Sequence, residues 1–426
     1  MRIARSAFCI AAAFAALAVV CPDRLHGQHP QTAQPPTFKS ATAIVEVDAV
    51  ILDKDGRFVP GLKADDVTLL EDGRPQKIEH FYMVTHDLGT GPNAPVSEYA
   101  DQADFRAHRL FVLLFDEGSL ANESLMRAKQ GAEAFVRDQM GPEDAGGVFV
   151  NGGMFRGLLT TDKLELLAGI RAVKPAFDTR QSILAPFREW PRIGSELDAT
   201  RISDGAREVT ASLASDACNE KPADCREAGG LEQVENLIQK KANLYVRQAQ
   251  NLMNQTVQNV QAVARGLGRL PGRKTVVFIT EGFYVEDSRS VLQTIAGEAA
   301  RSGVTIYSID ARGLINGRSP NPDVVRPDRA RSTAFDPGED GPDILTSGTG
   351  GFMVRGIDDM SRAFGLIVRD TSTYYVIGYQ PENATMDGKF RKIEVRTRVP
   401  KVKVRARKGY VAVNLPPQQS IWGPGK

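Results

Sequence analysis

Two short runs typical of buried strands, each followed at once by a carboxylate, constrain the fold of this 426-residue chain more than any other feature. Residues 110–115 (LFVLLF) lead into Asp116, and residues 275–280 (TVVFIT) lead into Glu281. Short apolar runs without polar alternation are typical of strands buried on both faces of a parallel sheet. Because the carboxyl ends of such strands line the ligand crevice of open α/β sheets, we expect both acids in one crevice.

Strands and amphipathic helices alternate through the middle of the chain. The pattern predicts further strands at 148–150, 154–160, 304–309 and 374–379, and helices at 123–140, 231–267, 288–302 and 356–370. Thr161 or Asp162 is expected to cap a further helix. This alternation predicts an α/β fold with a doubly wound, mostly parallel sheet of the Rossmann-like kind, in which 374–379 is the last strand.

Segments near both ends of the chain have a different pattern. Residues 40–85 and 381–413 alternate apolar and polar side chains, which predicts half-buried strands. We expect the two segments to form one small accessory β module, because a lone hairpin is marginally stable in water. A separate C-terminal hairpin is the alternative.

Two long connections interrupt the main domain, which is expected to span residues 108–380. Residues 191–230 form a polar insert, and residues 311–346 are rich in Pro, Asp, Arg and Gly without periodicity. A loop as long as the second one within a domain is either functional or disordered.

The first residues have the pattern of an export signal. Arg2 and Arg5 precede the apolar stretch Ala7–Val20, which is too short to span a bilayer comfortably. We therefore expect a signal peptide at 1–27, a linker at 28–39 and a secreted or periplasmic protein. A lipidated Cys21 and an uncleaved anchor are the alternatives. No second apolar run approaches membrane-spanning length, so no span is expected in the mature chain.

Two cysteines remain after the predicted cleavage, Cys218 and Cys225. An oxidising compartment would let them close a small loop as a disulfide, and two unrelated free thiols are the alternative. Their spacing is unlike that of a zinc site, and no histidine lies nearby.

Composition and motifs argue against several functions. A net charge of +1 gives no drive toward nucleic acid. The sequence contains no G-x-S-x-G elbow and no Walker A motif. No histidine follows His108, which argues against a histidine-based hydrolase. The enzymatic alternative is an acid/base pair of Asp116 and Glu281, with Phe283 and Tyr284 stacking on a sugar.

Four segments in combination resemble a known family. They are VDAVILDKDGRFVPGLKADDVTLLEDGRPQKIEHF, LFVLLFDEGSL, PGRKTVVFITEGF and YYVIGYQPEN…DGKFRKIEVRTR. The chain resembles a von Willebrand factor type A domain over residues 40–413, and more narrowly the secreted type-A-related proteins abundant in acidobacteria. The resemblance implies an exported, non-catalytic binding or adhesion module that contacts a protein partner or a cell surface. An envelope structural component is the alternative.

Type A domains commonly hold Mg²⁺ through an Asp-x-Ser-x-Ser motif after the first strand, a threonine from a second loop and an aspartate after the fourth strand. The resemblance assigns Asp116 to the first aspartate, Thr179 to the threonine and Glu281 to the last acid. A hard cation of this kind takes oxygen ligands and leaves a position for a carboxylate of the partner.

This chain departs from the metal-binding pattern at two positions. Gly118 and Leu120 stand where the two serines belong, and Ser119 is one position off. Because hydroxyl ligands are lost, we expect a degenerate site that has lost its Mg²⁺, and a protein that folds without metal.

The C-terminal segment is strongly basic. Between residues 389 and 408, Glu394 is the only acid. One interpretation is a polyanion contact by Lys392, Arg396, Arg398, Lys403 and Arg405. We favour the other interpretation, a solvated strand face that guards a sheet edge.

Overall fold

The computed structural model describes residues 44–86, 109–157, 159–176, 179–283, 289–313 and 340–415. The predicted signal peptide and linker lie outside the described residues, as do residues 314–339 of the predicted long loop. Within the described ranges, no helix combines the length and the apolarity that crossing a membrane would require.

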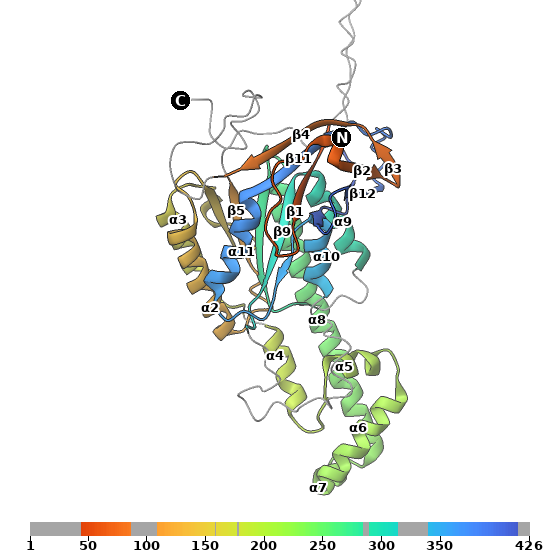
Figure 1. Cartoon of the computed structure of the whole chain (residues 1–426). Coiled ribbons are helices and arrows are strands. Elements are labelled where there is room, and N and C mark those ends of the chain that lie inside the picture. Colours follow the sequence, from red (N-terminus) through yellow and green to blue (C-terminus); the bar gives the residue numbers. More distant parts are fainter. Residues whose placement is uncertain are drawn as a thin grey trace, which may run out of the picture. The chain divides into compact units, whose positions relative to one another are not determined.

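A six-stranded sheet forms the centre of the structure (Figure 1). Its order is β10 (Met353–Val354), β9 (Val304–Asp310), β8 (Lys274–Thr280), β5 (Leu110–Phe115), β6 (Ala145–Val150) and β7 (Gly153–Met154). Neighbouring strands are parallel except β7, which is antiparallel to β6. Leu110 pairs with Lys274 and Phe115 with Ile279, so β5 and β8 end level with each other.

Helices cover both faces of this sheet. Phe111, Leu113 and Phe115 share one core with α2 (Asn122–Ala134), α3 (Lys163–Ala172) and α11 (Met360–Ser372). The alternate side chains of β5 share a second core with α8 (Leu231–Leu267), α9 (Arg289–Arg301) and α10 (Asp340–Thr349). The result is a mixed α/β fold with a mostly parallel sheet, consistent with the Rossmann-like kind.

The two ends of the described chain combine in a β-sandwich. One sheet has the order β13 (Lys403–Ala406), β1 (Val45–Leu52), β11 (Thr373–Tyr379) and β4 (Ile78–Thr85). The other has the order β14 (Gly409–Val411), β12 (Phe390–Thr397), β2 (Val67–Glu71) and β3 (Arg74–Gln76). Both sheets contribute to one core. The C-terminal strands therefore pair with the N-terminal ones, as the sequence analysis favours.

The sequence-based placement of β11 in the parallel sheet is wrong. This strand pairs antiparallel with both β1 and β4 in the sandwich. Tyr375, Ile377 and Tyr379 face the sandwich core, while Tyr374 and Val376 belong to a second apolar cluster. Because both of its faces are buried, the apolar run has the same pattern as a strand of a parallel sheet.

Other boundaries also differ from the expectations. The predicted strand 154–160 is reduced to β7, and the helix predicted at 123–140 ends as α2 at Ala134 and continues in a π-helical turn, Phe135–Gln139. The end of the predicted loop 311–346 is helical, because α10 buries Leu345 against the sheet. Short 3-10 turns lie at Ala64–Asp66, Phe155–Gly157 and Ala185–Arg188. The expected capping by Asp162 is confirmed, since it accepts the N–H of Leu164 at 2.8 Å.

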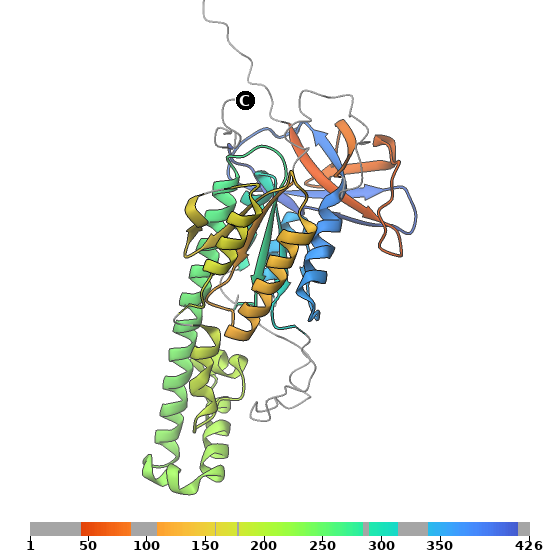
Figure 2. The same ribbon diagram turned by 90° about the vertical axis from the view of Figure 1, so that its left-hand side faces the viewer.

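The predicted polar insert is a helical layer along α8, as Figure 2 shows. The insert contributes α5 (Glu196–Ser203), α6 (Arg207–Glu220) and α7 (Pro222–Glu227), and α4 (Arg180–Leu184), which precedes the insert, completes the layer. It has a core of its own with the first half of α8. The helix α8 is continuous over 37 residues.

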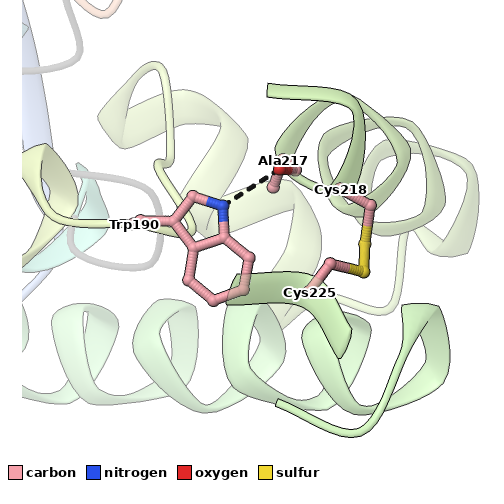
Figure 3. The surroundings of a disulfide bond; sticks show 4 residues. All are labelled: Trp190, Ala217, Cys218 and Cys225. Carbon is pink, nitrogen blue, oxygen red and sulfur yellow. Dashed lines mark hydrogen bonds between the residues drawn. A yellow bond between two sulfur atoms is a disulfide. The ribbon is translucent and has the colours of Figure 1, made fainter. Parts of the chain in front are cut away.

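A disulfide closes the turn between α6 and α7, as predicted. Cys218 and Cys225 are bonded, and beside them the indole Nε1–H of Trp190 donates to the carbonyl oxygen of Ala217 at 3.0 Å (Figure 3).

We expect the Cys218→Ser/Cys225→Ser double variant to lose about 2 kcal/mol of unfolding free energy, because the unfolded chain regains the freedom of a short loop. Urea denaturation would measure the loss. Under reducing conditions the wild type should lose a similar amount and the variant nothing, and an unchanged midpoint in the variant would contradict the prediction.

Close packing of α2 on α11 depends on Gly131. A Cβ at this position would overlap Met360 Cβ. Gly131→Ala should therefore destabilise the protein by about 1–3 kcal/mol despite the higher helix propensity of alanine. Gly266→Ala in α8 is the matched control, because nothing lies within 4 Å of its added Cβ. This control should be neutral or stabilising in the same urea titration, and equal effects at both positions would contradict the packing argument.

Candidate functional site

The first candidate residue, Asp116, lies where β5 ends against β8. Its backbone N–H donates to the carbonyl oxygen of Ile279 at 2.9 Å, which continues the pairing of the two strands by one residue. Asp116 is only 3% exposed. The crevice at the carboxyl end of the strands therefore contains a carboxylate that is shielded from solvent.

Hydroxyl groups from two separate elements satisfy this carboxylate. Thr256 in α8 donates to Asp116 Oδ1 at 2.7 Å, and Thr280 at the end of β8 donates to Oδ2 at 2.7 Å. The Ser119 and Thr280 hydroxyls lie 3.0 Å apart, and the Ser119 hydroxyl also donates to the Asp116 carbonyl oxygen at 3.2 Å. Each carboxylate oxygen thus has a short hydrogen bond from a buried threonine.

Burial raises the pKa of Asp116 above its ordinary value. Hydrogen bonds from Thr256, Thr280 and Ser119 oppose the rise, and the negative charge of Glu281 adds to it. The net direction is upward because removal from water disfavours the charged form more than the hydroxyls stabilise it.

Glu281 has a structural role in the same loop. Its Oε1 accepts the N–H of Ala121, the residue at the N-terminus of α2, at 3.1 Å. Its own N–H donates to the Ser119 hydroxyl at 3.1 Å. Since Ala121 has no side chain that could cap the helix, the glutamate supplies the acceptor that a helix N-terminus needs.

Thr179 does not join this group. It is the N-cap of α4, where its hydroxyl accepts the N–H of Ser182 at 3.3 Å and Ser182 donates back to the Thr179 carbonyl oxygen at 2.8 Å. The next residue, Arg180, ties the loop to the crevice by donating to the Glu281 carbonyl oxygen at 2.9 Å and pairing with Glu196 at 3.0 Å.

The donor set does not fit the Mg²⁺ site that the resemblance implies. Both Asp116 oxygens accept hydrogen bonds from threonine hydroxyls, and the Thr179 and Glu281 side chains cap helices. The loop is also covered, because a Cβ at Gly118 would lie 3.2 Å from Leu252 Cδ2 of α8. Among the described residues, no group of three or more His, Cys, Asp or Glu side chains is arranged to hold a metal ion.

Among the described residues, the space beside the Asp116 loop is small. A cavity of ≈ 20 Å³ remains between the Gly118–Ser119 loop, α4 and α8. One buried water needs about 10–15 Å³ of such space, so this cavity between described residues is too small for a sugar ring. Phe283 packs on Phe278, with ring centroids 6.3 Å apart, and Tyr284 lies outside the described residues.

Sequence reasoning missed three residues of the site: Thr256, Thr280 and Arg180. The signal for Thr280 is its position directly before Glu281 at the end of a strand. The signal for Thr256 is a polar residue, 4% exposed, within the apolar stripe of α8. No pattern identified Arg180, because only the tertiary structure brings α4 to the end of β8.

The candidate polyanion-binding residues do not share one surface. Four of them are exposed: Lys392 and Arg396 on β12, Arg398 directly after it, and Lys403 at the start of β13. The Arg405 side chain is only 20% exposed and forms an ion pair with Asp370. Arg405 therefore belongs to a different environment from the other four.

Comparison with known proteins identifies no family. No protein-family model and no curated protein matches the chain. One similar solved structure is an aerotolerance-related membrane protein from Bacteroides fragilis NCTC 9343 with multiple mutations to serines, at 13% identity and a TM-score of 0.32, covering 62% of this chain and 98% of that chain. Another is the conserved hypothetical protein BatB from Bacteroides thetaiotaomicron, at 15% identity and a TM-score of 0.31, covering 62% of this chain and 97% of that chain. Similarity at this level carries no argument about function.

The raised pKa of Asp116 predicts a pH-dependent effect of Asp116→Asn. In the unfolded chain this aspartate loses its proton at about pH 3.9, whereas in the folded protein Asp116 keeps its proton to a higher pH. The contribution of Asp116 to stability is therefore complete below the unfolded pKa and is lost as pH rises through the folded pKa. Asparagine does not titrate. The variant should therefore gain stability relative to wild type as pH rises above about 4, where the unfolded aspartate loses its proton, and urea denaturation would measure the gain.

Asp387→Asn is the control for this measurement. Hydrogen bonds from the Lys389 backbone and the Arg391 side chain lower the pKa of Asp387. The wild type should therefore be more stable than Asp387→Asn near neutral pH, and this difference should be lost as pH falls, which is the opposite trend. The same trend in both variants would contradict the assignment to Asp116.

Proposed function

We propose that this protein is an exported, non-catalytic protein-binding module of the von Willebrand factor type A kind, built on a doubly wound sheet, that binds its partner without a metal ion. The observation that carries the proposal is that each oxygen of the buried Asp116 carboxylate accepts a hydrogen bond from a threonine, Thr256 or Thr280. A carboxylate that is buried and hydrogen-bonded in this way stabilises the fold and is not available to coordinate Mg²⁺ or to transfer a proton to a substrate.

Export is supported by the sequence and by the disulfide. The basic and apolar N-terminal segment has the pattern of a signal peptide. The Cys218–Cys225 bond is of a kind that persists in oxidising compartments.

The helical layer is the proposed contact surface. In open α/β sheets, ligands bind at the carboxyl ends of the strands, and in this chain α4 and α8 cover that position. Leu237 and Leu244 of α8 are 38% and 45% exposed and lie seven residues apart, on one face of the helix. A partner that approaches this end of the sheet therefore meets α8 with its exposed leucines, and the helical layer packed along it.

Photo-crosslinking tests this surface. A benzoylphenylalanine at position 237 or 244, introduced in the producing cell, should give discrete protein adducts. The same probe at position 164 is the matched control, because Leu164 is an exposed leucine (75%) on α3, away from the helical layer. Adducts from position 164 alone would contradict the proposed surface.

Metal independence is tested separately by calorimetry. Titration of Mg²⁺ or Mn²⁺ into the metal-stripped protein should give no saturable heat at about 1 mM metal. EDTA should leave the melting temperature unchanged, because threonine hydroxyls already satisfy the carboxylate. Saturable binding that Asp116→Ala abolishes would restore the adhesion-site interpretation.

Turnover measurements test the non-catalytic part of the proposal. Hydrolysis of glycans or peptides should not exceed that of a matched Asp116→Asn, Glu281→Gln double variant. Turnover that the double variant loses would favour the carboxylate-based hydrolase.

A further inference from the structure

A second cavity lies at the other end of β8 from Asp116. It has a volume of ≈ 50 Å³ and is lined by residues of β1, by the segments that enter β8 and β9, and by β13 with the residue that follows it. Three arginines line it: Arg273, Arg405 and Arg407. The cavity thus lies where the sandwich meets the amino ends of the parallel strands.

These arginines are buried and incompletely hydrogen-bonded. The Arg273 side chain is 9% exposed and Arg407 is 8% exposed. Four of their buried nitrogen atoms have no hydrogen-bond partner: Arg273 Nε, Arg273 Nη1, Arg405 Nε and Arg407 Nε. Since a buried donor without a partner loses its hydration without compensation, this is an unusual concentration of unsatisfied groups.

Aromatic rings and single hydrogen bonds hold the guanidinium groups in place. Arg273 lies over the Tyr374 ring at 4.3 Å, and its Nη2 donates to the Tyr307 hydroxyl at 2.9 Å. Arg407 donates to the carbonyl oxygen of Ala300. Ring contacts of this kind orient a guanidinium group without using its N–H donors. The ring contacts therefore fix the guanidinium groups and leave unpaired, buried N–H donors on residues that line the cavity.

The charges around the cavity are unevenly buried. Asp370 pairs with Arg405. The two carboxylates of the lining are closer to solvent, since Glu46 is exposed and the Asp48 side chain is 24% exposed. Asp48 Oδ2 lies 3.6 Å from Arg273 Nε, and Arg407 has no ion-pair partner among the described residues. An unpaired buried cation is costly, and a bound anion would offset that cost.

Backbone shape also favours a small ligand. Gly272, Gly303 and Gly350 line the cavity with positive φ angles of 72°, 70° and 88°. A Cβ at Gly350 would lie 2.8 Å from the backbone nitrogen of Arg407. Glycine is therefore required for the close approach that encloses this cavity.

We infer that this cavity binds a small tetrahedral oxyanion, of the phosphate or sulfate type, through Arg273, Arg405 and Arg407. Guanidinium groups match such anions because they present several N–H donors in a planar fork. The available volume is several times the roughly 10–15 Å³ that one water needs, which suits an ion of this size and excludes a nucleotide. The site is independent of the crevice at Asp116 and of the proposed function.

Isothermal titration calorimetry on the full mature chain tests the inference. Sodium phosphate and sodium sulfate, titrated against a sodium chloride blank of equal ionic strength, should each bind at one saturable site. Arg273→Lys should weaken binding about tenfold, because lysine keeps the charge but loses the forked donors. The matched control is Arg391→Lys. Arg391 is also buried and also has an Nε without a hydrogen-bond partner, but its Nη2 pairs with Asp387 and the residue does not line the cavity. The control should bind like the wild type.

Asp48→Asn should change the affinity for phosphate in the opposite direction to Arg273→Lys. This test does not depend on whether an arginine variant folds. Removal of a rim carboxylate should strengthen phosphate binding several-fold. The same titration with glycerol 3-phosphate distinguishes two sources of the anion. Binding as tight as that of phosphate identifies the head group of a phosphomonoester as a ligand, and weaker binding identifies the free ion. No saturable binding of phosphate or sulfate at about 10 mM, or equal affinity in the wild type, Arg273→Lys and Asp48→Asn, would overturn the inference.

Discussion

The burial of one carboxylate, Asp116, sets the arrangement at the carboxyl end of the parallel sheet. A buried carboxylate without hydrogen bonds would cost several kcal/mol, so its two oxygens need donors that are also buried. Thr280 supplies one donor because β5 and β8 pair in register, and Thr256 supplies the other because α8 crosses the strand ends. The long helix and the sheet are therefore joined by polar contacts as well as by apolar packing.

These contacts also place helices over the end of the sheet where ligands of open α/β sheets normally bind. A sheet of this type normally offers its strand ends to a ligand, but here α4 and α8 occupy that position, and Arg180 connects α4 to the end of β8. Of the residues that a metal site would use, Thr179 and Glu281 cap helices, and Asp116 accepts hydrogen bonds from threonine hydroxyls. The proposed function therefore places partner recognition on α8 and the helical layer instead of the strand ends.

The opposite end of the sheet is organised by the β-sandwich. β11 follows α11 directly and lies between β1 and β4, so the central domain and the sandwich share a continuous chain at this point. The junction largely buries three arginines: Arg273 directly before β8, Arg405 in β13 and Arg407 directly after it. The two ends of β8 therefore differ in charge: one holds a carboxylate among hydroxyls, and the other holds guanidinium groups beside an open cavity.

The sequence by itself determined the elements whose side chains follow a clear period. Strands β5, β8 and β9, helix α8, the cap at Asp162 and the pairing of Cys218 with Cys225 were all predictable, because each depends on local pattern or on compartment chemistry. The sheet to which β11 belongs was not predictable, since a strand buried on both faces has the same pattern in either sheet. The surroundings of Asp116 and the clustering of Arg273, Arg405 and Arg407 were decided by the tertiary structure, because contacts between residues more than a hundred positions apart leave no period in the sequence.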